Sequence, residues 1–430
     1  MTAKKEPAGR LSRRGFLRAA GAGAVIASSA GILASCSAGV GGTAGSGSVQ
    51  NLVLLTNEWN SVMSDAATRA AKVLGLGYGE SSFNTDDTVA FKQAQDAVIR
   101  GADLLLLQPA DGSAVPAVAR LARQNEAYLS VMINAAPWTS PFEYGPNYVW
   151  FVTLQEDVNH YEASKTLVAE VARRGNGTGT ILHVSGFPGS PIDNQRTKAV
   201  EKALAEYPGV RLLGSQPGKW SPEGGQEATE SLIARFGVPN GIIAQNDGSL
   251  TGVLAGLAGL KLTPGKDVLL SGADGASDIL RAIRDGKVLA TSFTSPAYFG
   301  VAAVARLYDA LHGYEFTAPE RQMGVTGFTA NAANIDGVLA RYVDTDRLPF
   351  DPRLMSRVAS GVDWDPQTGL APLRVDDYYD SQGAPKPDGY QYPTEYKQAL
   401  DSGLLDVIAK EYVAANKIRL DDFSYKGIVE

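Results

Sequence analysis

Short apolar runs alternate with longer segments of helical spacing over residues 51–311. Nearly continuous apolar runs are typical of strands that are buried on both faces of a sheet. The predicted strands are Leu52–Leu55, Ala102–Leu107, Leu129–Ile133, Thr180–Val184, Gly241–Ala244 and Val268–Leu270. The predicted helices are Asp65–Leu74, Val89–Arg100, Val115–Gln124, Tyr161–Arg173, Asp193–Tyr207, Gln226–Arg235, Ser277–Arg284 and Tyr298–Leu311. This order predicts an α/β fold with doubly wound parallel sheets that carry helices on both faces.

The length of the alternating region and its end define the domains. An alternation of about 270 residues is too long for one comfortable hydrophobic core, so we expect two lobes. After Tyr342 the alternation stops: residues 343–395 are rich in Asp, Pro, Gly and Tyr, and a helical pattern follows from Tyr396 to Asn416. Residues 343–430 are therefore expected to form a C-terminal extension that packs on one lobe or lies across both. Because long structureless connections are unusual, part of it should be functional or form an interface.

The N-terminal segment has the composition of an export signal. Six Lys and Arg residues and one Glu occupy positions 1–18, and an uncharged apolar run follows at 19–34. Ser12–Leu17 resembles the twin-arginine export motif, and Leu33–Cys36 resembles a bacterial lipobox, in which the cysteine is lipidated. We therefore expect a signal peptide at residues 1–35, a lipid anchor on Cys36 and a flexible tether at residues 36–49. The alternative is that Cys36 is an ordinary small residue near a cleavage site.

Composition excludes several classes of protein. The chain carries 39 Lys and Arg against 46 Asp and Glu, so no basic surplus favours nucleic-acid binding. A single cysteine excludes a disulfide scaffold and a Cys-rich zinc site, and the histidines at 160, 183 and 312 lack metal-ligand spacing. There is no P-loop, no His-Glu-x-x-His motif and no Gly-x-Ser-x-Gly elbow between a strand and a helix. We therefore expect no metal, no cofactor and no catalysis.

Polar side chains cluster at the positions just after the predicted strands. In parallel sheets these positions meet at one edge, where ligands of doubly wound folds bind. The segments are Thr56–Asn60, Gln108–Asp111, Asn134–Ala136, Gly186–Asn194, Gln245–Asp247, Gly272–Gly275 and Thr291–Pro296. They are rich in Asn, Asp, Gln and Thr and include one Trp. Amides and carboxylates pair with hydroxyl groups and Trp offers a flat apolar face, so a neutral polyhydroxylated ligand suits this set better than a phosphate.

Residues 50–342 resemble the ribose-type periplasmic binding proteins, the type I solute receptors of ABC sugar importers. The motifs that carry the resemblance are Leu107–Asp111, Arg196 in the helix after Gly186–Ser190, Ala244–Asp247 and Gly272–Gly275, in the family's order. The resemblance implies two lobes joined by three hinge strands, with crossings near Thr153, Thr294 and Gly324–Gly327 and a ligand between the lobes. It implies an N-terminal lobe of residues 50–153 and 295–324 and a C-terminal lobe of residues 154–294 and 325–342.

The same resemblance implies a set of ligand-binding residues. Carried over position by position, the set is Asn57, Trp59, Asn134, Asn194, Trp220, Asn246, Asp274 and Thr294. Trp59 and Trp220 would stack on the sugar from opposite lobes. Asn246 and Asp274 match the family's most characteristic polar ligands, although both could also be helix N-caps.

Two positions depart from the family's pattern. Ala135 and Asn194 stand where ribose binders carry arginines, so the site is expected to lack two guanidinium groups that fork around sugar hydroxyls. The resemblance therefore implies a different sugar, or a smaller polyol, as the ligand.

The sequence thus predicts a lipid-anchored, monomeric solute-binding protein on the outer face of the cytoplasmic membrane, in a periplasm or at a cell surface. It would capture a sugar or polyol by hinge closure and deliver it to the permease of an ABC importer, with no nucleic-acid partner. Two alternatives stay open: a sensory receptor of the same fold, and a secreted carbohydrate-active enzyme whose chemistry lies in residues 343–430. Against the enzyme, residues 343–430 contain no His and no Cys, although a pair of carboxylates is formally possible.

Overall fold

The computed structural model describes residues 47–430. The predicted signal peptide at 1–35, the predicted lipidation site Cys36 and nearly all of the predicted tether lie outside the described residues. The first strand, β1 (Ser48–Val53), is buried from Val49 onward. It therefore includes the last two residues of the expected tether, Ser48 and Val49.

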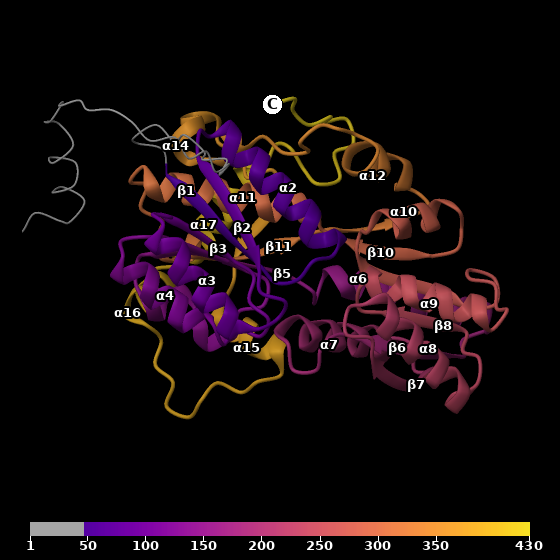
Figure 1. The fold of residues 1–430 in the computed structure, drawn as a ribbon. Coiled ribbons are helices and arrows are strands. Elements are labelled where there is room, and N and C mark those ends of the chain that lie inside the picture. Colours follow the sequence, from indigo (N-terminus) through magenta and orange to yellow (C-terminus); the bar gives the residue numbers. More distant parts are fainter. Residues whose placement is uncertain (1–46) are drawn as a thin grey trace, which may run out of the picture. The chain divides into compact units, whose positions relative to one another are not determined.

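The first of two sheets belongs to the N-terminal lobe and has seven strands, in the order β13-β11-β5-β4-β3-β1-β2 (Figure 1). Besides β1, its strands are β2 (Gly77–Ser82), β3 (Leu104–Leu107), β4 (Tyr128–Met132), β5 (Tyr148–Leu154), β11 (Gln322–Thr326) and β13 (Gly369–Pro372). All neighbouring strands are parallel except β13, which pairs antiparallel with β11. The helices of this lobe are α2 (Glu58–Val73), α3 (Asp87–Ile99), α4 (Val115–Gln124), η1 (Pro137–Thr139), α5 (Pro141–Tyr144), α11 (Pro296–Leu311) and η2 (Ala318–Arg321).

The second sheet belongs to the C-terminal lobe and has six strands, in the order β12-β10-β9-β8-β6-β7. Its strands are β6 (Gly179–Ser185), β7 (Val210–Pro217), β8 (Gly241–Ala244), β9 (Leu269–Asp274), β10 (Ala290–Phe293) and β12 (Phe328–Asn331). Only β12 runs antiparallel to its neighbour, β10. The helices of this lobe are α6 (Asn159–Arg174), α7 (Pro191–Ala205), α8 (Pro222–Phe236), α9 (Asp247–Gly259), α10 (Ser277–Arg284) and α12 (Ile335–Tyr342).

The central strands are buried on both faces, as strands between two layers of helices must be. Every residue of β3 and of β8 is buried. The helices turn an apolar face toward the sheets: the buried residues of α4 are Val115, Val118, Ala119 and Ala122. This is the three- and four-residue spacing from which the helix was predicted. Within residues 47–430, no helix combines the length and the apolarity that crossing a membrane requires.

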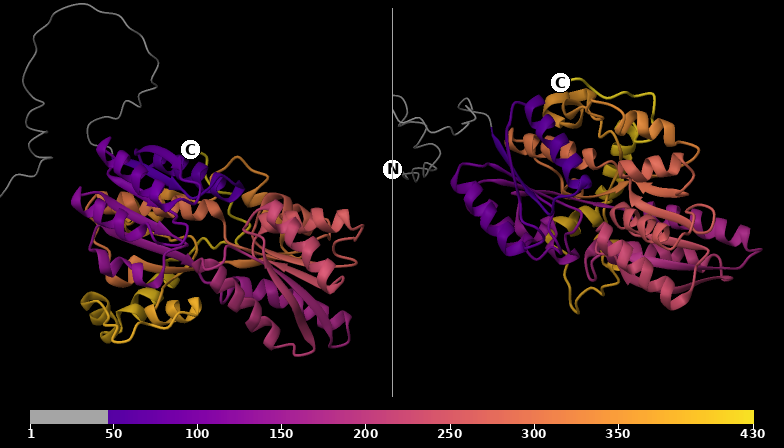
Figure 2. Two further views of the ribbon diagram at one scale, coloured as in Figure 1. Left: turned by 60° about the horizontal axis from the view of Figure 1, so that its bottom comes forward. Right: turned by 45° about the vertical axis from the view of Figure 1, so that its right-hand side comes forward.

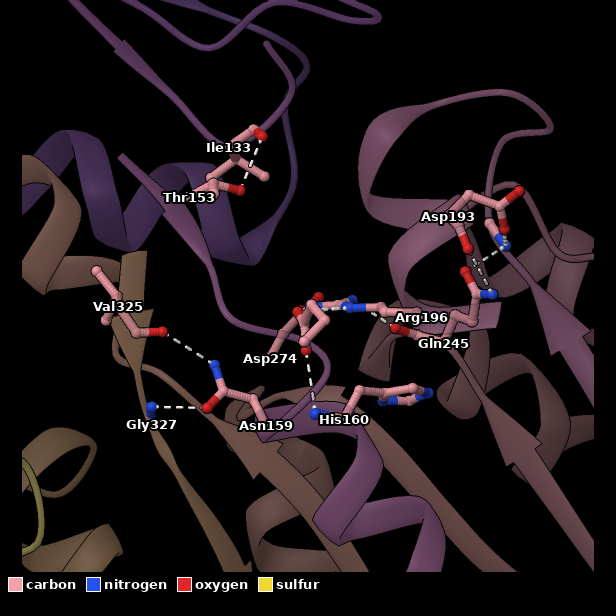
Figure 3. Close-up of polar contacts among 12 residues, drawn as sticks. Ile133, Thr153, Asn159, His160, Asp193, Arg196, Gln245, Asp274, Val325 and Gly327 are labelled. Atoms are coloured by element: carbon pink, nitrogen blue, oxygen red, sulfur yellow. Dashed lines mark hydrogen bonds and ion pairs between the residues drawn. The ribbon is translucent and has the colours of Figure 1, made fainter. Parts of the chain in front are cut away.

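The chain crosses between the two sheets three times: between β5 and α6, between β10 and α11, and between β11 and β12. The last crossing is a single residue, Gly327, where a Cβ atom would lie 2.2 Å from the carbonyl oxygen of Phe293. Asn159 ties this crossing to the first one. Its Nδ2 donates to the carbonyl oxygen of Val325 at 3.2 Å, and its Oδ1 accepts from the N–H of Gly327 at 2.8 Å (Figure 3).

Residues 343–430 form an extension that contacts both lobes (Figure 2). Besides β13, its elements are α13 (Pro352–Met355), α14 (Arg357–Ser360), η3 (Gly361–Asp363), α15 (Val375–Gln382), α16 (Thr394–Asp401) and α17 (Leu404–Ala415). Toward the N-terminal lobe, Arg357 Nη2 donates to Glu320 Oε1 at 2.9 Å. Toward the C-terminal lobe, Lys198 Nζ of α7 donates to the carbonyl oxygen of Asp380. Of the two arrangements expected from the sequence, the extension adopts the one that lies across both lobes.

Candidate ligand-binding site

A small cavity is lined by residues that follow strands in both lobes. Its volume is about 60 Å³, and we call it the inner cavity. Its lining residues are Leu54, Leu55, Asn57, Trp59, Asn60, Gln108, Ile133, Asn134, Leu154, Ile192, Arg196, Trp220, Asn246 and Asp274. It adjoins a larger opening of about 690 Å³, the outer cleft, which shares Asn57, Trp59, Trp220, Asn246 and Asp274 with it. Both lobes thus contribute to one hollow with polar and aromatic walls.

The structure brings together most of the site residues predicted from the sequence. Asn57, Trp59, Asn134, Trp220, Asn246 and Asp274 all line the inner cavity. Asn194 does not line it and instead borders a separate pocket, together with Trp138 and Gln382. Thr294 borders neither: it is buried, and a Cβ atom on Gly327 would lie 2.4 Å from its hydroxyl oxygen. Thr294 therefore packs at the third crossing rather than against the cavity.

Asn57 and Asn246 are positioned by the helices that they cap. Asn57 Oδ1 accepts from the backbone N–H of Asn60 at 2.9 Å at the start of α2. Asn246 Oδ1 accepts from the backbone N–H of Ser249 at 3.0 Å at the start of α9. The two roles considered for Asn246, helix cap and cavity residue, therefore occur together.

Arg196, which the sequence analysis named as a family motif but not as a site residue, also lines the inner cavity. Its Nη2 donates to Asp274 Oδ1 at 2.9 Å (Figure 3). Its Nε donates to Glu156 Oε1 at 2.8 Å. Its Nη1 donates to the carbonyl oxygen of Gln245. Ala135 and Asn194, the two positions expected to lack a guanidinium group, are separate from Arg196, so the cavity still holds one guanidinium, bound by three acceptors.

Helical phase explains why Asn194 and Arg196 have different surroundings. Residues two positions apart on an α-helix point to nearly opposite sides, whereas residues four apart share a face. Ile192 and Arg196 share the face of α7 that lines the inner cavity, and Asn194 does not. The four-residue spacing of Ile192 and Arg196 was therefore the signal in the sequence that could have identified the arginine.

The charges at the cavity are buried and paired. Burial raises the pKa of Asp274 and of Glu156 above the ordinary value, while the Arg196 guanidinium acts in the opposite direction. For Arg196, burial lowers the pKa, but the two carboxylates outweigh burial and raise it, so the guanidinium stays charged. The Arg196 side chain is only 5% exposed, and hydrogen bonds between such desolvated groups are stronger than in water. A charged donor and a carboxylate acceptor thus lie side by side, an arrangement that can bind neighbouring hydroxyl groups.

Three residues of the lining have backbone angles that are unusual away from glycine. The angle φ is 69° at Ile133, 56° at Trp220 and 105° at Asp274. A positive φ is costly for any side chain and most of all for a β-branched one such as Ile133. At Asp274 the turn is held by Asp247, whose Oδ2 accepts from the backbone N–H groups of the two residues after Asp274, each at 2.8 Å. Strain of this kind at a cavity is typical of functional sites.

Several buried polar atoms of the lining have no hydrogen-bond partner among residues 47–430. They are Asn60 Oδ1, Gln108 Oε1, Asn134 Oδ1 and Trp220 Nε1. Buried polar groups are normally paired, and a hydroxyl group can both donate and accept. The lining therefore complements a small molecule with several hydroxyl groups. Asn60 and Gln108 belong to the polar segments identified from the sequence but were not among the predicted site residues. In the described part of the chain, no three His, Cys, Asp or Glu side chains are grouped so that they could hold a metal ion.

The two tryptophans of the lining come from different lobes and are held by aromatic neighbours. Trp59 of α2 packs on Phe299, with 5.7 Å between the ring centroids. Trp220 meets Phe187 edge to face at 5.2 Å. A Cβ atom on Gly186 would lie 2.2 Å from Trp220 Nε1, so the indole lies directly on the backbone of that glycine. Each ring offers the inner cavity an apolar surface of fixed orientation.

The family model described as periplasmic binding protein domain matches residues 53–315. The chain is 25% identical over 271 residues to the ribose import binding protein of Escherichia coli, a match that covers 61% of this chain and 84% of the relative. It is 26% identical over 275 residues to the xylitol-binding protein of Mycolicibacterium smegmatis, which covers 63% of this chain and 74% of the relative.

Solved structures share the same fold. A twin-arginine translocation pathway signal protein from Burkholderia phytofirmans matches with a TM-score of 0.64 and 20% identity, over 70% of this chain and 94% of that protein. A periplasmic sugar-binding protein from Pseudomonas fluorescens matches with a TM-score of 0.64 and 22% identity, over 74% of this chain and 96% of that protein. Taken with the match over residues 53–315, the two lobes and their three crossings show that the chain belongs to the periplasmic binding protein family.

Proposed function

We propose that this protein captures a small neutral sugar or polyol in the inner cavity and delivers it to the permease of an ABC importer. The observation that carries the proposal is the lining of that cavity: two tryptophans, amides with unpartnered oxygens, and the Arg196–Asp274 pair. Aromatic rings pack on the apolar faces of sugars, and the polar groups pair with hydroxyls. Relatives named for ribose import, xylitol binding and D-apiose import support this ligand class.

Capture would work by closure of the two lobes about the three crossings. A ligand favours the closed state only if it binds that state more tightly than the open one, which requires contacts with both lobes. Asn57, Trp59 and Asn134 would supply the contacts from the N-terminal lobe, and Arg196, Trp220, Asn246 and Asp274 those from the C-terminal lobe. Closure would also exclude water from the hydrogen bonds to Arg196 and Asp274.

The size of the inner cavity favours a small ligand. About 60 Å³ is little beside the pockets of about 300–1,000 Å³ that hold drug-sized molecules. A sugar ring would therefore occupy part of the outer cleft as well, whereas a short polyol would need less of it.

The proposal includes export and anchoring. Membership of the periplasmic binding protein family supports an extracytoplasmic location. We expect residues 1–35 to direct export and Cys36 to carry a lipid that holds the protein on the outer face of the cytoplasmic membrane. Because the family consists of solute-binding proteins, we expect this protein to bind its ligand without changing it covalently. We also expect a monomer.

A thermal-shift screen tests the ligand class. The sample is residues 36–430 with Cys36→Ser, and the probes are D-ribose, L-arabinose, D-allose, xylitol, glycerol and myo-inositol, with glucose 6-phosphate as an anionic comparison. A ligand at about 100 times its Kd should add about 2.7 kcal/mol to the free energy of unfolding. We expect a shift with a neutral probe and none with the phosphate. If no neutral probe shifts a sample that unfolds cooperatively, the proposal fails.

A pair of variants, one inside the inner cavity and one outside it, assigns that shift to the inner cavity. Trp220→Ala should weaken binding of the best probe by about 1–3 kcal/mol, because it removes a buried aromatic contact. Ile99→Ala changes an exposed apolar side chain that lines neither the inner cavity nor the outer cleft, and it should leave the affinity for that probe unchanged. Titration calorimetry measures both. Equal affinities for the two variants would remove Trp220 from the site.

A further inference from the structure

A second hollow, which we call the edge pocket, is formed by three parts of the chain. Its volume is about 250 Å³. Asp111 and Trp138 border it from the N-terminal lobe, Asn194 from the C-terminal lobe and Gln382 from the extension. None of the residues that line it also lines the inner cavity or the outer cleft. It is therefore a separate place for a ligand.

The edge pocket and the inner cavity lie on opposite sides of the same two segments. In the segment after β4, Asn134 borders the inner cavity, whereas Trp138 borders the edge pocket. At the start of α7, Ile192 borders the inner cavity, whereas Asn194 borders the edge pocket. One segment belongs to each lobe, so the edge pocket, like the inner cavity, depends on how the lobes face each other.

The extension supplies a fixed wall of the edge pocket. Tyr378 of α15 is 2% exposed, donates its hydroxyl to the carbonyl oxygen of Ala135 and packs on Phe151 with 5.5 Å between ring centroids. On the other side, Lys198 Nζ of α7 donates to the carbonyl oxygen of Asp380. Helices α7 and α15 lie next to each other (Figure 1). Helix α15 is thus held by both lobes, and its last residue, Gln382, is placed at the pocket.

The chemistry of the edge pocket is that of a carbohydrate site. Trp138 lines the pocket and is 58% exposed, so its indole is accessible as a stacking surface. Gln382 is 8% exposed, and its Nε2 has no hydrogen-bond partner among the described residues. Asn194 adds a second amide and Asp111 a carboxylate, while no Lys or Arg borders the pocket. An aromatic ring can stack on a sugar, and amides and a carboxylate can pair with its hydroxyl groups. Because the pocket has no cation, it suits a neutral sugar ring better than an anion.

We propose that the edge pocket is a second binding site for a neutral sugar ring, which stacks on Trp138 and accepts a hydrogen bond from Gln382. The site goes beyond the proposed capture in the inner cavity and does not require the same sugar. Because its walls come from both lobes and the extension, a bound ring favours the lobe arrangement that forms the pocket. By reciprocity, occupancy of either site then raises the affinity of the other.

The five tryptophans of the chain allow each site to be observed separately. In residues 36–430 with Cys36→Ser, 5-fluorotryptophan gives fluorine NMR signals that single Trp→Phe variants assign. Trp138 reports on the edge pocket and Trp59 and Trp220 on the inner cavity. Trp150 and Trp364 are buried elsewhere and serve as internal controls. The probes are the methyl pyranosides of glucose, galactose, mannose and xylose.

We expect at least one methyl pyranoside to shift the Trp138 signal in a saturable way. Gln382→Ala should weaken that response about tenfold, the cost of one lost hydrogen bond to a buried amide. Gln398→Ala, which changes an exposed glutamine of α16, should leave the response unchanged. Trp138→Ala, judged by titration calorimetry, should abolish the same binding event without a loss of folding, because the side chain is exposed.

Two results would overturn the proposal. One is a Trp138 signal that no probe shifts in a saturable way up to about 50 mM, a concentration that fills a site of millimolar affinity. The other is a Trp138 response that Gln382→Ala does not weaken. The proposal for the inner cavity has its own readout: if Trp138 responds while Trp59 and Trp220 respond to no neutral sugar or polyol, the edge pocket stands and the inner-cavity function fails.

Discussion

Arg196 connects two parts of the site that belong to different elements. Glu156 lies in the first crossing, after β5, and Asp274 ends β9, yet one guanidinium donates to both carboxylates. A buried ion pair as a whole adds little to stability, but removal of one partner leaves an uncompensated buried charge. Arg196 therefore holds the first crossing and the cavity wall together. Its removal should lower both the free energy of unfolding and the affinity for the ligand.

Arg196→Ala should lower the free energy of unfolding by about 3–5 kcal/mol, because Glu156 and Asp274 would stay buried without their partner. Arg196→Lys should cost less, since it keeps a positive charge but cannot donate to both carboxylates in the same geometry. Urea unfolding at neutral pH measures both variants. A loss below about 1 kcal/mol for the alanine variant would mean that water reaches the two carboxylates.

His183 of β6 should make stability fall in mild acid. Burial lowers its pKa to about 4, and its Nδ1 lies 2.9 Å from Ser215 Oγ. Above pH 6.5 the imidazole is neutral in the folded and the unfolded chain; between pH 6.5 and 4 only the unfolded chain takes up the proton, so stability decreases as the pH falls. The expected loss from this group between pH 7 and pH 5 is about 2 kcal/mol.

Comparison of the parent with His183→Gln isolates that contribution in urea unfolding at the two pH values. The variant should lose less stability between pH 7 and pH 5 than the parent. Other groups act on both proteins alike: burial lowers the pKa of His160 in the same sense, and the raised pKa values of Asp274 and Glu156 act in the opposite sense. Identical losses in parent and variant would show that His183 is hydrated in the folded chain.

At the scale of elements, about half of the strands could be predicted from the sequence. Each of the six predicted strands overlaps an observed one, namely β1, β3, β4, β6, β8 and β9. The strands β2 and β7 were missed because they lie at sheet edges, where their residues are mostly half-buried or exposed and the apolar pattern is weak. The strands β12 and β13 are short and mostly half-buried or exposed. Burial is not the whole reason, because β5, β10 and β11 are buried almost throughout and were not predicted either.

The residues of the candidate site could also be predicted only in part. Residues directly after strands could be identified because a parallel sheet places its carboxyl ends together, and Asn57, Asn134 and Asn246 line the inner cavity as a result. Arg196 lies on the second turn of α7, where the direction of a side chain depends on helical phase rather than on strand position. The edge pocket could not be predicted, because its walls meet only when the extension docks.

The third crossing should tolerate no side chain at its single residue. Gly327→Ala should lower the free energy of unfolding by about 1–3 kcal/mol or more, because its Cβ would overlap the carbonyl oxygen of Phe293. Gly259→Ala in α9 is the matched control, since no heavy atom lies within 4 Å of its Cβ position. Alanine is favoured over glycine in a helix, so the control should be neutral or stabilising. Thermal unfolding compares them, and a neutral Gly327→Ala would show that the crossing can shift.

For the molecule as a whole, the extension is part of the architecture of both lobes. Arg69 of α2, in the N-terminal lobe, forms an ion pair with Glu430 at the end of the extension. In the C-terminal lobe, Phe423 packs on Phe328 with 5.9 Å between ring centroids. Together with α15, these contacts connect the lobes outside the three crossings. Closure of the lobes must therefore carry the extension along or exchange some of its contacts.

Removal of residues 343–430 should abolish cooperative unfolding. The N-terminal lobe would lose β13 from the edge of its sheet, and the buried Asp309 would lose the backbone N–H groups of Arg357 and Val358, at 2.8 and 3.0 Å. Buried charges without partners are costly. Circular dichroism melts of residues 36–342 and 36–430, both with Cys36→Ser, compare the two chains. An unchanged midpoint in the shorter chain would show that the lobes are stable without the extension.

The sheet of the N-terminal lobe also sets an order of folding during synthesis. Its strands come from residues 48–154, 322–326 and 369–372, so the lobe that leaves the ribosome first is completed by residues made near the end. The C-terminal lobe takes most of its strands from residues 179–293 and needs only β12 from later in the chain. Pairing between distant segments is slow, because the entropy of closing a long loop must be overcome first. We therefore expect the second lobe to form before the first, in the reverse of the order in which the ribosome makes them.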